Sequence, residues 1–299
     1  MFTVGAPDSP EPPSAGWFTR AMTTTLNAGI DDQLITMNRK LIGLDVDGTL
    51  VDHYGHMSPA IREAGAAVVG AGHEVVIATG RSLGATLPVV ELLGVDHGYA
   101  VCSNGGVVVQ IHAGANGGYT VIDRRSFDPA PALRALRHRL PNAKYALEDI
   151  EGNFLSTERF QDASFGVEAR GVSFGELLEA EAVRLVVFST DATAEEFGEA
   201  VQSIGLHGVT YSVGWTAWLD IAAHGVTKAS GLEHVRSLLG VDRADTVCIG
   251  DGRNDIEMLQ WAGRGVAMGQ APAEVKAAAN EVTAPVEEDG AAAILRSLL

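Results

Sequence analysis

The sequence has little cysteine and no long apolar run. Its 299 residues include only two cysteines, Cys102 and Cys248, and both lie inside apolar segments, AVCS and TVCIG. Cysteines in such surroundings are typical of buried, reduced thiols, so no disulfide framework is expected and a reducing, cytoplasmic location fits. No apolar run has the length that a membrane span needs. The first residues also lack the basic and apolar regions of a secretory signal peptide, so none is expected.

Basic residues are scarce too. There are 21 lysines and arginines against 38 aspartates and glutamates, which gives a net charge of -17 at pH 7. That charge argues against nucleic acid or an anionic membrane as a partner. It would also repel an anionic substrate at long range, so a phosphate site must contain its own cations. The hydrophobic content of 46% is ordinary for a globular protein, and the length allows one large domain or two moderate ones.

Two kinds of metal site are excluded by missing residues. His53, His56 and His224 have no partner at the spacing of metal ligands, so we interpret them as surface residues. A calcium-binding loop that starts at Asp45 is excluded because its sixth and twelfth positions are Leu50 and His56. Such a loop needs glycine and a bidentate glutamate there.

The segment LIGLDVDGTLVD, residues 41–52, is the most informative part of the chain. The apolar run 41–44 predicts a strand buried in a parallel sheet. Alternate residues of a strand point to one side, so we expect Asp45 and Asp47 to project together from its carboxyl end. Two carboxylates held close repel each other, so either one stays protonated or a cation lies between them. An ordinary Asp-Gly turn after the strand is the alternative.

Strands and helices alternate through most of the chain. This pattern predicts a doubly wound α/β fold with a parallel sheet, formed by residues 39–121 and 225–299. Residues 122–224 instead mix helices with short strands, which is typical of a separate α+β domain with an antiparallel sheet. Residues 1–38 begin with a segment rich in proline, glycine and serine. We expect them to be a flexible tail without a functional role.

Two helices have clear start signals. Ser58 and Pro59 are an N-cap followed by proline at the first helical position. Thr227 can cap a second helix that starts at Lys228 and closes at Gly240. The residues of this second helix that we expect to face inward are Leu232, Val235, Leu238 and Leu239.

Polar residues from four separate segments are expected at the same edge of the parallel sheet. They are Asp45 and Asp47, Thr79, Lys228, and Asp251 with Asp255. Two or three carboxylates around one point form a hard oxygen site suited to Mg²⁺. A hydroxyl and an ammonium suit the peripheral oxygens of a phosphoryl group, so the set indicates metal-assisted phosphoryl transfer. Taken singly, each group has an ordinary explanation, because Lys228 could be a solvated surface lysine and Thr79 an N-cap.

These motifs, in this order, resemble those of the haloacid dehalogenase-like (HAD) hydrolase superfamily. DVDGT at 45–49 is similar to the first family motif, ATGR at 78–81 to the second, GVTKASGL at 225–232 to the third and GDGRND at 250–255 to the fourth. The insertion between the second and third motifs implies a C2-type cap over a Rossmann-like core. The SNGG segment at 103–106 and EVTAPVEEDG near the end are similar to the Cof-type (IIB) subfamily of sugar-phosphate and related phosphatases.

The resemblance implies roles for the acidic residues. Asp45 would attack phosphorus and form an aspartyl phosphate. Asp45 and Asp251 would bind Mg²⁺ through their side chains, and Asp47 through its backbone carbonyl. The Asp47 carboxyl group would then be available to protonate the leaving group and later to deprotonate water. Asp255, also placed at the metal site, would orient a metal-bound water or Lys228.

The remaining implied roles concern phosphate and substrate. Thr79 and Lys228 would hold the phosphoryl oxygens, with Gly80 beside them, and Asn254 would reach the phosphate or the substrate. The roles of two further residues stay open. Asn104 either contacts the substrate or only supports a turn before glycine. Arg81 either contacts the substrate or only pairs with a surface carboxylate.

The function that the resemblance implies is a magnesium-dependent phosphatase for small phosphorylated metabolites, with sugar phosphates foremost. A cap over the site would exclude large phosphoproteins, and we expect a monomer or a small homo-oligomer. A phosphosugar mutase of the phosphomannomutase-like type is one alternative, and it would keep the phosphoryl group in its products. A catalytically silent sugar-phosphate-binding regulator is another, although the presence of both Asp45 and Asp47 argues against it.

Overall fold

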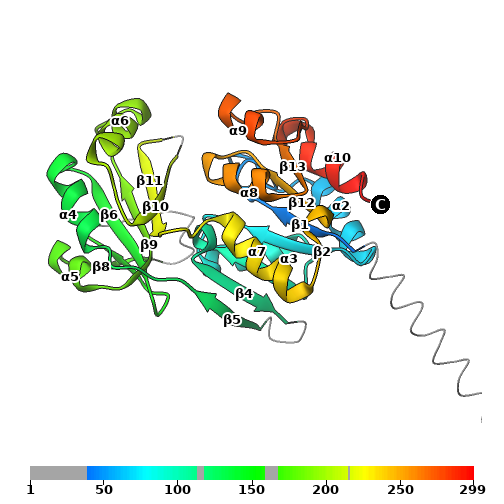
Figure 1. Cartoon of the computed structure of the whole chain (residues 1–299), viewed down its shortest axis with the longest axis horizontal. Coiled ribbons are helices and arrows are strands. Elements are labelled where there is room, and N and C mark those ends of the chain that lie inside the picture. Colours follow the sequence, from blue (N-terminus) through cyan, green and yellow to red (C-terminus); the bar gives the residue numbers. More distant parts are fainter. Residues whose placement is uncertain (1–38, 113–117, 159–167, 215) are drawn as a thin grey trace, which may run out of the picture. The chain divides into compact units, whose positions relative to one another are not determined.

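The computed structural model describes residues 39–112, 118–158, 168–214 and 216–299. The expected flexible tail, residues 1–38, lies outside them. Within the described residues the strands form an eight-stranded and a six-stranded sheet (Figure 1). No helix in these ranges is both long enough and apolar enough to cross a membrane.

The larger sheet is mainly parallel and has β1 at its centre. Its strands are, in chain order, β1 (Leu41–Leu44), β2 (Glu74–Ala78), β3 (Gly98–Cys102), β4 (Val107–Ile111), β5 (Tyr119–Arg124), β12 (Thr246–Gly250), β13 (Arg264–Ala267) and β14 (Glu281–Val282). Their spatial order is β14-β13-β12-β1-β2-β3-β4-β5. The antiparallel pair β4–β5 was not predicted, and the expected domain boundary at 121/122 falls inside β5.

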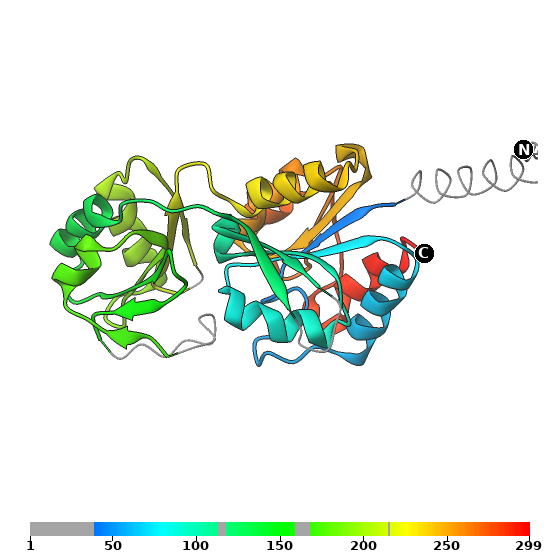
Figure 2. The same ribbon diagram turned by 90° about the horizontal axis from the view of Figure 1, so that it is seen from below.

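Helices cover both faces of this sheet. They are α2 (Pro59–Gly70), α3 (Leu83–Leu92), α7 (Lys228–Leu239), α8 (Ile256–Trp261), α9 (Ala273–Ala278) and α10 (Gly290–Arg296). Short 3₁₀ turns are η1 (Ser103–Gly105), η2 (Arg243–Asp245), η3 (Arg253–Asp255) and η4 (Val286–Glu288). In Figure 2, α7 (yellow) lies on one side of the sheet, with α2 (blue) and α10 (red) on the other.

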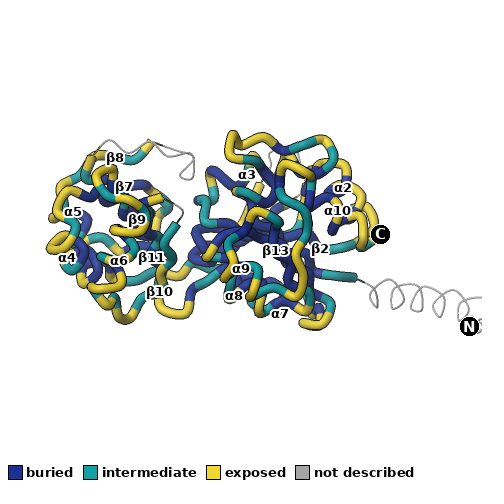
Figure 3. The backbone as a smooth tube through the Cα atoms, turned by 90° about the horizontal axis from the view of Figure 1, so that it is seen from above, coloured by how far each residue is buried: buried dark blue, intermediate teal, exposed yellow. Residues whose placement is uncertain are grey.

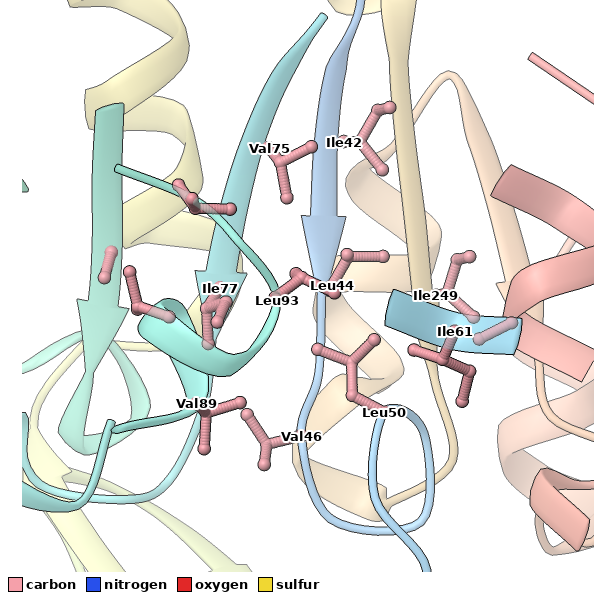
Figure 4. Packing of buried hydrophobic residues seen from close by; sticks show 14 of the residues in the cluster. Ile42, Leu44, Val46, Leu50, Ile61, Val75, Ile77, Val89, Leu93 and Ile249 are labelled. Carbon is pink, nitrogen blue, oxygen red and sulfur yellow. The ribbon is translucent and has the colours of Figure 1, made fainter. Parts of the chain in front are cut away.

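The alternation of side chains along β1 explains the two helical layers. Ile42 and Leu44 pack in the cluster that includes Ile61 of α2 and Leu93 after α3 (Figure 4). Leu41 points the other way and packs with the apolar residues of α7 and α8. A strand buried on both faces must be apolar at every position, as LIGL is. The prediction of a doubly wound α/β fold is therefore confirmed.

The helix-start signals agree with the structure, but one inward residue of α7 was predicted wrongly. The Ser58 hydroxyl accepts a hydrogen bond from the Ile61 N–H at 3.2 Å, and Thr227 caps α7. Leu238, expected inside, is 54% exposed. The buried stripe of α7 contains Lys228 and Leu232. At about 3.6 residues per turn, Leu239 returns to their side while Leu238 points away.

The smaller sheet lies within the chain segment between β5 and α7. Its strands are β6 (Lys144–Asp149), β7 (Phe154–Ser156), β8 (Arg170–Gly171), β9 (Ala182–Phe188), β10 (Val209–Val213) and β11 (Trp218–Ala223), in the order β10-β11-β9-β6-β7-β8. The helices of this segment are α4 (Ala130–Arg139), α5 (Phe174–Glu179) and α6 (Ala194–Ile204). Pairing is antiparallel except between β7 and β8.

The two faces of the smaller sheet differ in chemistry. Leu185 and Leu219 point to the face packed against α4 and α6, where they join a buried cluster with Leu133 and Phe197. Figure 3 shows this interior as buried (dark blue) and the outer turns of the helices as exposed (yellow). The alternate residues of β9 and β11, which include Arg184 and Asp220, point to the opposite face. That face carries charge, and it takes part in the site described below.

A glycine in β13 gives a direct test of the packing between α8 and the sheet. A Cβ atom at Gly265 would collide with the backbone carbonyl oxygen of Leu259. We expect Gly265→Ala to lower the free energy of unfolding by about 1–3 kcal/mol, the usual cost of overpacking. Gly70→Ala is the matched control, because a Cβ there meets open space and the change should stay within about 1 kcal/mol. Equal urea midpoints for the two variants would contradict this packing.

Candidate active site

Asp45 is held at the carboxyl end of the central strand. Its backbone N–H donates to the carbonyl oxygen of Ile249 at 3.0 Å, so it continues the parallel pairing of β1 with β12. Its side chain is buried, with the residue 5% exposed. Asp251 follows β12 directly, so the two aspartates leave neighbouring strands at the same edge. This is the juxtaposition that the sequence predicted.

A buried lysine joins two of the acidic side chains. The Lys228 Nζ donates to Oδ1 of Asp45 and to Oδ1 of Asp255, both at 2.6 Å, and the lysine is only 1% exposed. Because Lys228 is the first residue of α7, the Thr227 cap and the packing of α7 fix where its side chain starts. Burial alone would lower the pKa of Lys228, but Asp255 and Asp45 raise it above its ordinary value. The lysine therefore stays charged.

Asp255 is an organising group in this arrangement. Its Oδ1 accepts from Lys228, and its Oδ2 accepts from the backbone N–H groups of Asp251 at 2.9 Å and Gly252 at 2.8 Å. Both carboxylate oxygens are thus engaged, which fixes the loop after β12. Of the two roles expected for Asp255, the structure places it against Lys228.

Three carboxylates gather around one point. Asp45, Asp251 and Asp255 each offer an oxygen, and these oxygens all lie within 4.8 Å of one another. Burial raises the pKa of Asp45 well above its usual range, and Asp255 raises it further, although Lys228 opposes this. Burial and then Asp255 also raise the pKa of Asp251 to about 7. When all three carboxyl groups are ionised, the site has more negative charge than Lys228 alone balances.

The donor set fits a divalent cation. Three carboxylates and one ammonium leave two negative charges in a buried site, and a doubly charged cation would balance them. The donors are hard oxygens, which suit Mg²⁺. Asp47 lies outside this group of three side chains, but it is near enough to raise the pKa values of Asp45 and Asp251. Gln270 helps to place Asp251, since its Nε2 donates to Asp251 Oδ2 at 3.2 Å and to the Gly48 carbonyl at 2.6 Å.

Asp47 is engaged by Arg81. The guanidinium donates from Nε to Asp47 Oδ2 at 2.9 Å and from Nη2 to Oδ1 at 2.5 Å. The Asp47 side chain is 61% exposed, whereas that of Arg81 is 16% exposed. Of the two interpretations left open for Arg81, pairing with a carboxylate is the one present here, and the carboxylate is the expected acid and base.

The remaining expected phosphate and substrate residues also reach this edge. Thr79 is 1% exposed, and its hydroxyl oxygen accepts from the Arg81 N–H at 3.1 Å. Gly80 lines the same cavity of about 400 Å³ as Asp45 and Asp47. Asn254 donates from Nδ2 to Oδ1 of Asn104 at 3.0 Å, and both amides line an adjoining cavity of about 750 Å³.

The loop that carries Asn104 is strained. Ser103 and Asn104 both have left-handed backbones, with φ of 51° and 54°, which is unfavourable for residues other than glycine. The backbone N–H groups of Ser103 and Asn104 donate to the carbonyls of Arg81 and Thr79, which holds the strained turn against the neighbouring loop. Such strain persists only where surrounding contacts enforce it, so the position of Asn104 is tightly set.

Sequence reasoning missed a second group of polar residues, on the smaller sheet. Arg184 and Asp220 line the same cavity as Asp45, and Arg184 Nε donates to Asp220 Oδ1 at 2.6 Å. Glu148, on the strand next to Arg184, accepts from the Ser103 hydroxyl at 2.5 Å. A signal for Arg184 and Asp220 exists in the sequence, because each charge interrupts an otherwise apolar strand, AVRLVVF or WLDIAA.

Comparisons with known proteins agree with this geometry. The model of the haloacid dehalogenase-like hydrolase family matches residues 42–295. The protein YkrA of Bacillus subtilis strain 168 is 31% identical over 271 residues, which cover 88% of this chain and 98% of YkrA. The pyridoxal phosphate phosphatase YbhA of Escherichia coli K12 is 30% identical over 280 residues, covering 88% of this chain and 100% of YbhA.

A solved structure has a similar fold. The HAD subclass IIB sugar phosphatase BT4131 superposes with a TM-score of 0.71 at 28% identity, covering 87% of this chain and 100% of that protein. The chain therefore belongs to the haloacid dehalogenase-like hydrolase family, as the motifs predicted, and it is an enzyme of the phosphatase class.

Proposed function

We propose that this enzyme is a Mg²⁺-dependent phosphatase that hydrolyses small phosphorylated metabolites, sugar phosphates foremost, through an aspartyl phosphate on Asp45. One observation carries the proposal. Asp45 is buried and bonded to Lys228 at 2.6 Å, within 4.8 Å of two further carboxylates. A carboxylate fixed beside an ammonium and a cation site can meet an anionic phosphate without prohibitive repulsion.

The reaction has two displacements. In the first, an Asp45 carboxylate oxygen attacks phosphorus, the ester P–O bond breaks, and the Asp47 carboxyl group protonates the leaving alkoxide. In the second, Asp47 removes a proton from water, whose oxygen attacks the same phosphorus. The bond between phosphorus and Asp45 breaks, inorganic phosphate leaves, and both aspartates return to their starting states.

The other residues position and neutralise charge. Thr79 and Lys228 hold the peripheral phosphoryl oxygens, and Asp255 holds Lys228 in place. Mg²⁺, bound by the side chains of Asp45 and Asp251 and the carbonyl of Asp47, would neutralise charge between the carboxylates and the phosphate. Asn254 and Asn104 act together as a bonded pair at the substrate side.

The pairing of Arg81 with Asp47 gives Arg81 a defined part in this scheme. To accept a proton from water, Asp47 must be an ionised carboxylate, and the guanidinium orients both of its oxygens. Proton donation to the leaving group requires the opposite form, so the Asp47 carboxyl must turn away from Arg81 in the first displacement. Its 61% side-chain exposure leaves room for that movement.

The smaller sheet and its helices act, in this proposal, as the C2-type cap. The core is then residues 39–121 and 225–299, with the cap at 122–224. Residues 119–124 pair with β4 of the larger sheet, and the Arg125 N–H donates to the Gly106 carbonyl. These contacts support a cap that starts slightly later, after Arg125. Because residues of both sheets line the cavity at Asp45, the cap limits substrates to small molecules. The activities named for YbhA and BT4131, on pyridoxal phosphate and on sugar phosphates, agree with this size class.

A phosphate-release screen tests the proposal. The full-length protein is incubated with sugar phosphates, nucleotides, flavin mononucleotide and pyridoxal phosphate, with Mg²⁺ or with EDTA. We expect inorganic phosphate from at least one small monoester, and loss of that release in EDTA. Release that is indifferent to metal would contradict the metal site. Turnover that keeps the phosphoryl group in an isomerised product would identify a mutase instead.

A further inference from the structure

A row of charged residues crosses the helix-free face of the smaller sheet. Glu148 on β6 and Arg184 on β9 are direct neighbours in the β6–β9 pairing, and Asp220 on β11 follows on the next strand. Glu148 and Arg184 are each 3% exposed. Burying charges costs free energy that hydrophobic side chains would not. A buried row on the face that lines the active-site cavity therefore calls for a functional explanation.

Within this row, Asp220 is held by two donors. Arg184 Nε donates to its Oδ1 at 2.6 Å, and Trp218 Nε1 donates to its Oδ2 at 2.9 Å. Each donor engages one carboxylate oxygen, and a carboxylate oxygen can accept more than one hydrogen bond. The side chain of Asp220 is 18% exposed. Asp220 is therefore a fixed acceptor that still faces the cavity, and not a mobile surface carboxylate.

The cavity places this acceptor opposite the reacting groups. The space of about 400 Å³ is lined by Asp45, Asp47 and Arg81 from the larger sheet and by Arg184, Trp218 and Asp220 from the smaller one. A phosphate at Asp45 would direct its ester group into this space. The part of the substrate that lies farthest from phosphorus then meets the smaller sheet.

We propose that Asp220, positioned by Arg184 and Trp218, selects the leaving group by accepting hydrogen bonds from its hydroxyl groups. This inference rests on the proposed phosphatase function and names its substrate class, a phosphomonoester of a neutral polyol or sugar. Arg184 lies between Glu148 and Asp220, so it does not cancel the charge of Asp220 alone, and the carboxylate favours neutral hydroxyl donors. A second anionic group on the substrate would be repelled by the carboxylate. The Trp218 ring adds a flat apolar wall of the kind that sugar rings pack against.

Substitution of Asp220 tests this selection. Wild type, Asp220→Asn and Trp218→Phe are compared on the best sugar phosphate from the screen and on phenyl phosphate, which has no hydroxyl group. For Asp220→Asn we expect kcat/KM on the sugar phosphate to fall about 10- to 100-fold, the usual effect of a lost charged hydrogen bond. On phenyl phosphate it should change less than about threefold. Trp218→Phe keeps an aromatic ring, although a smaller one, but removes the donor, so it should weaken the sugar reaction in the same direction, chiefly through KM.

The controls distinguish a loss of substrate selection by Asp220 from a loss of folding. They also distinguish failure of this inference from failure of the proposed phosphatase function. Asp191→Asn makes the same chemical change at an exposed position of the same segment, outside both cavities, and should leave both reactions unchanged. Thermal midpoints are recorded for every variant. Equal losses on both substrates, or a wild type that prefers phenyl phosphate to every sugar phosphate, would overturn the inference and leave the phosphatase proposal standing. A wild type that releases phosphate from no monoester would overturn both.

Discussion

Replacing Asp45 by asparagine is expected to reduce phosphate release by more than about a thousandfold, because the amide cannot attack phosphorus. The fold should survive the change. Asp45 is buried and its pKa is raised well above the usual range, chiefly by burial. Because the folded-state pKa lies above that of the unfolded chain, Asp45 costs the fold free energy at pH 7. Asparagine removes that cost, and Lys228 keeps its bond to Asp255. The free energy of unfolding should fall by no more than about 1 kcal/mol.

The measurement is steady-state phosphate release together with urea unfolding at pH 7. Asp96→Asn is the matched control, because this side chain is 72% exposed, pairs with its neighbour His97 and lines neither of the two cavities. It should retain full activity. An Asp45→Asn enzyme with more than about a tenth of wild-type activity, well folded and free of wild-type contamination, would show that another group is the nucleophile.

Replacing Lys228 by methionine is expected to damage both stability and activity. Lys228 is bonded to Asp45 and Asp255 at 2.6 Å each, and all three side chains are buried. Removing one member of a buried charged group leaves the others uncompensated, which costs about 3–5 kcal/mol. Methionine keeps the apolar stem and therefore isolates the loss of charge. Lys276→Met, in the last turn of α9, is the control and should change the free energy of unfolding by less than about 0.5 kcal/mol.

A double variant makes this expectation specific. If the damage in Lys228→Met comes from the unbalanced carboxylates, removing one of them should relieve it. Lys228→Met combined with Asp45→Asn should therefore be more stable than Lys228→Met alone, measured by urea unfolding in EDTA. Simple additivity of the two changes would mean that the lysine stabilises the fold by packing and not by balancing charge.

The convergence of Asp45 and Asp251 could be predicted because it depends on backbone rules. Residues that follow neighbouring parallel strands must lie at one edge of the sheet, and the sequence motifs indicated which strands carry these residues. The burial of Lys228 could not be predicted from its helix position, since a lysine in a first turn is usually solvated. Lys228 can be buried because its ammonium group donates hydrogen bonds to the carboxylates of Asp45 and Asp255.

The contacts within the smaller sheet and those of Arg81 could not be predicted from the sequence, for a different reason. Arg184 and Asp220 meet only because of the strand register between β9 and β11, and a shift by one residue would place them on opposite faces. The bidentate pairing of Arg81 with Asp47 depends on two loops from different strands. The β4–β5 hairpin was missed because its strands continue the larger sheet in antiparallel fashion, which the alternating pattern does not indicate.

The stereochemistry at phosphorus tests the central claim most directly. Hydrolysis of a phosphorothioate monoester whose phosphorus carries sulfur, ¹⁶O and ¹⁸O, run in H₂¹⁷O, gives chiral inorganic thiophosphate. Its configuration reports the number of in-line displacements, because each one inverts the configuration. Attack by Asp45 followed by attack by water requires two displacements, so we expect inorganic thiophosphate with net retention, whether or not an intermediate accumulates. Net inversion would mean that water attacks the substrate directly, and it would contradict a covalent role for Asp45.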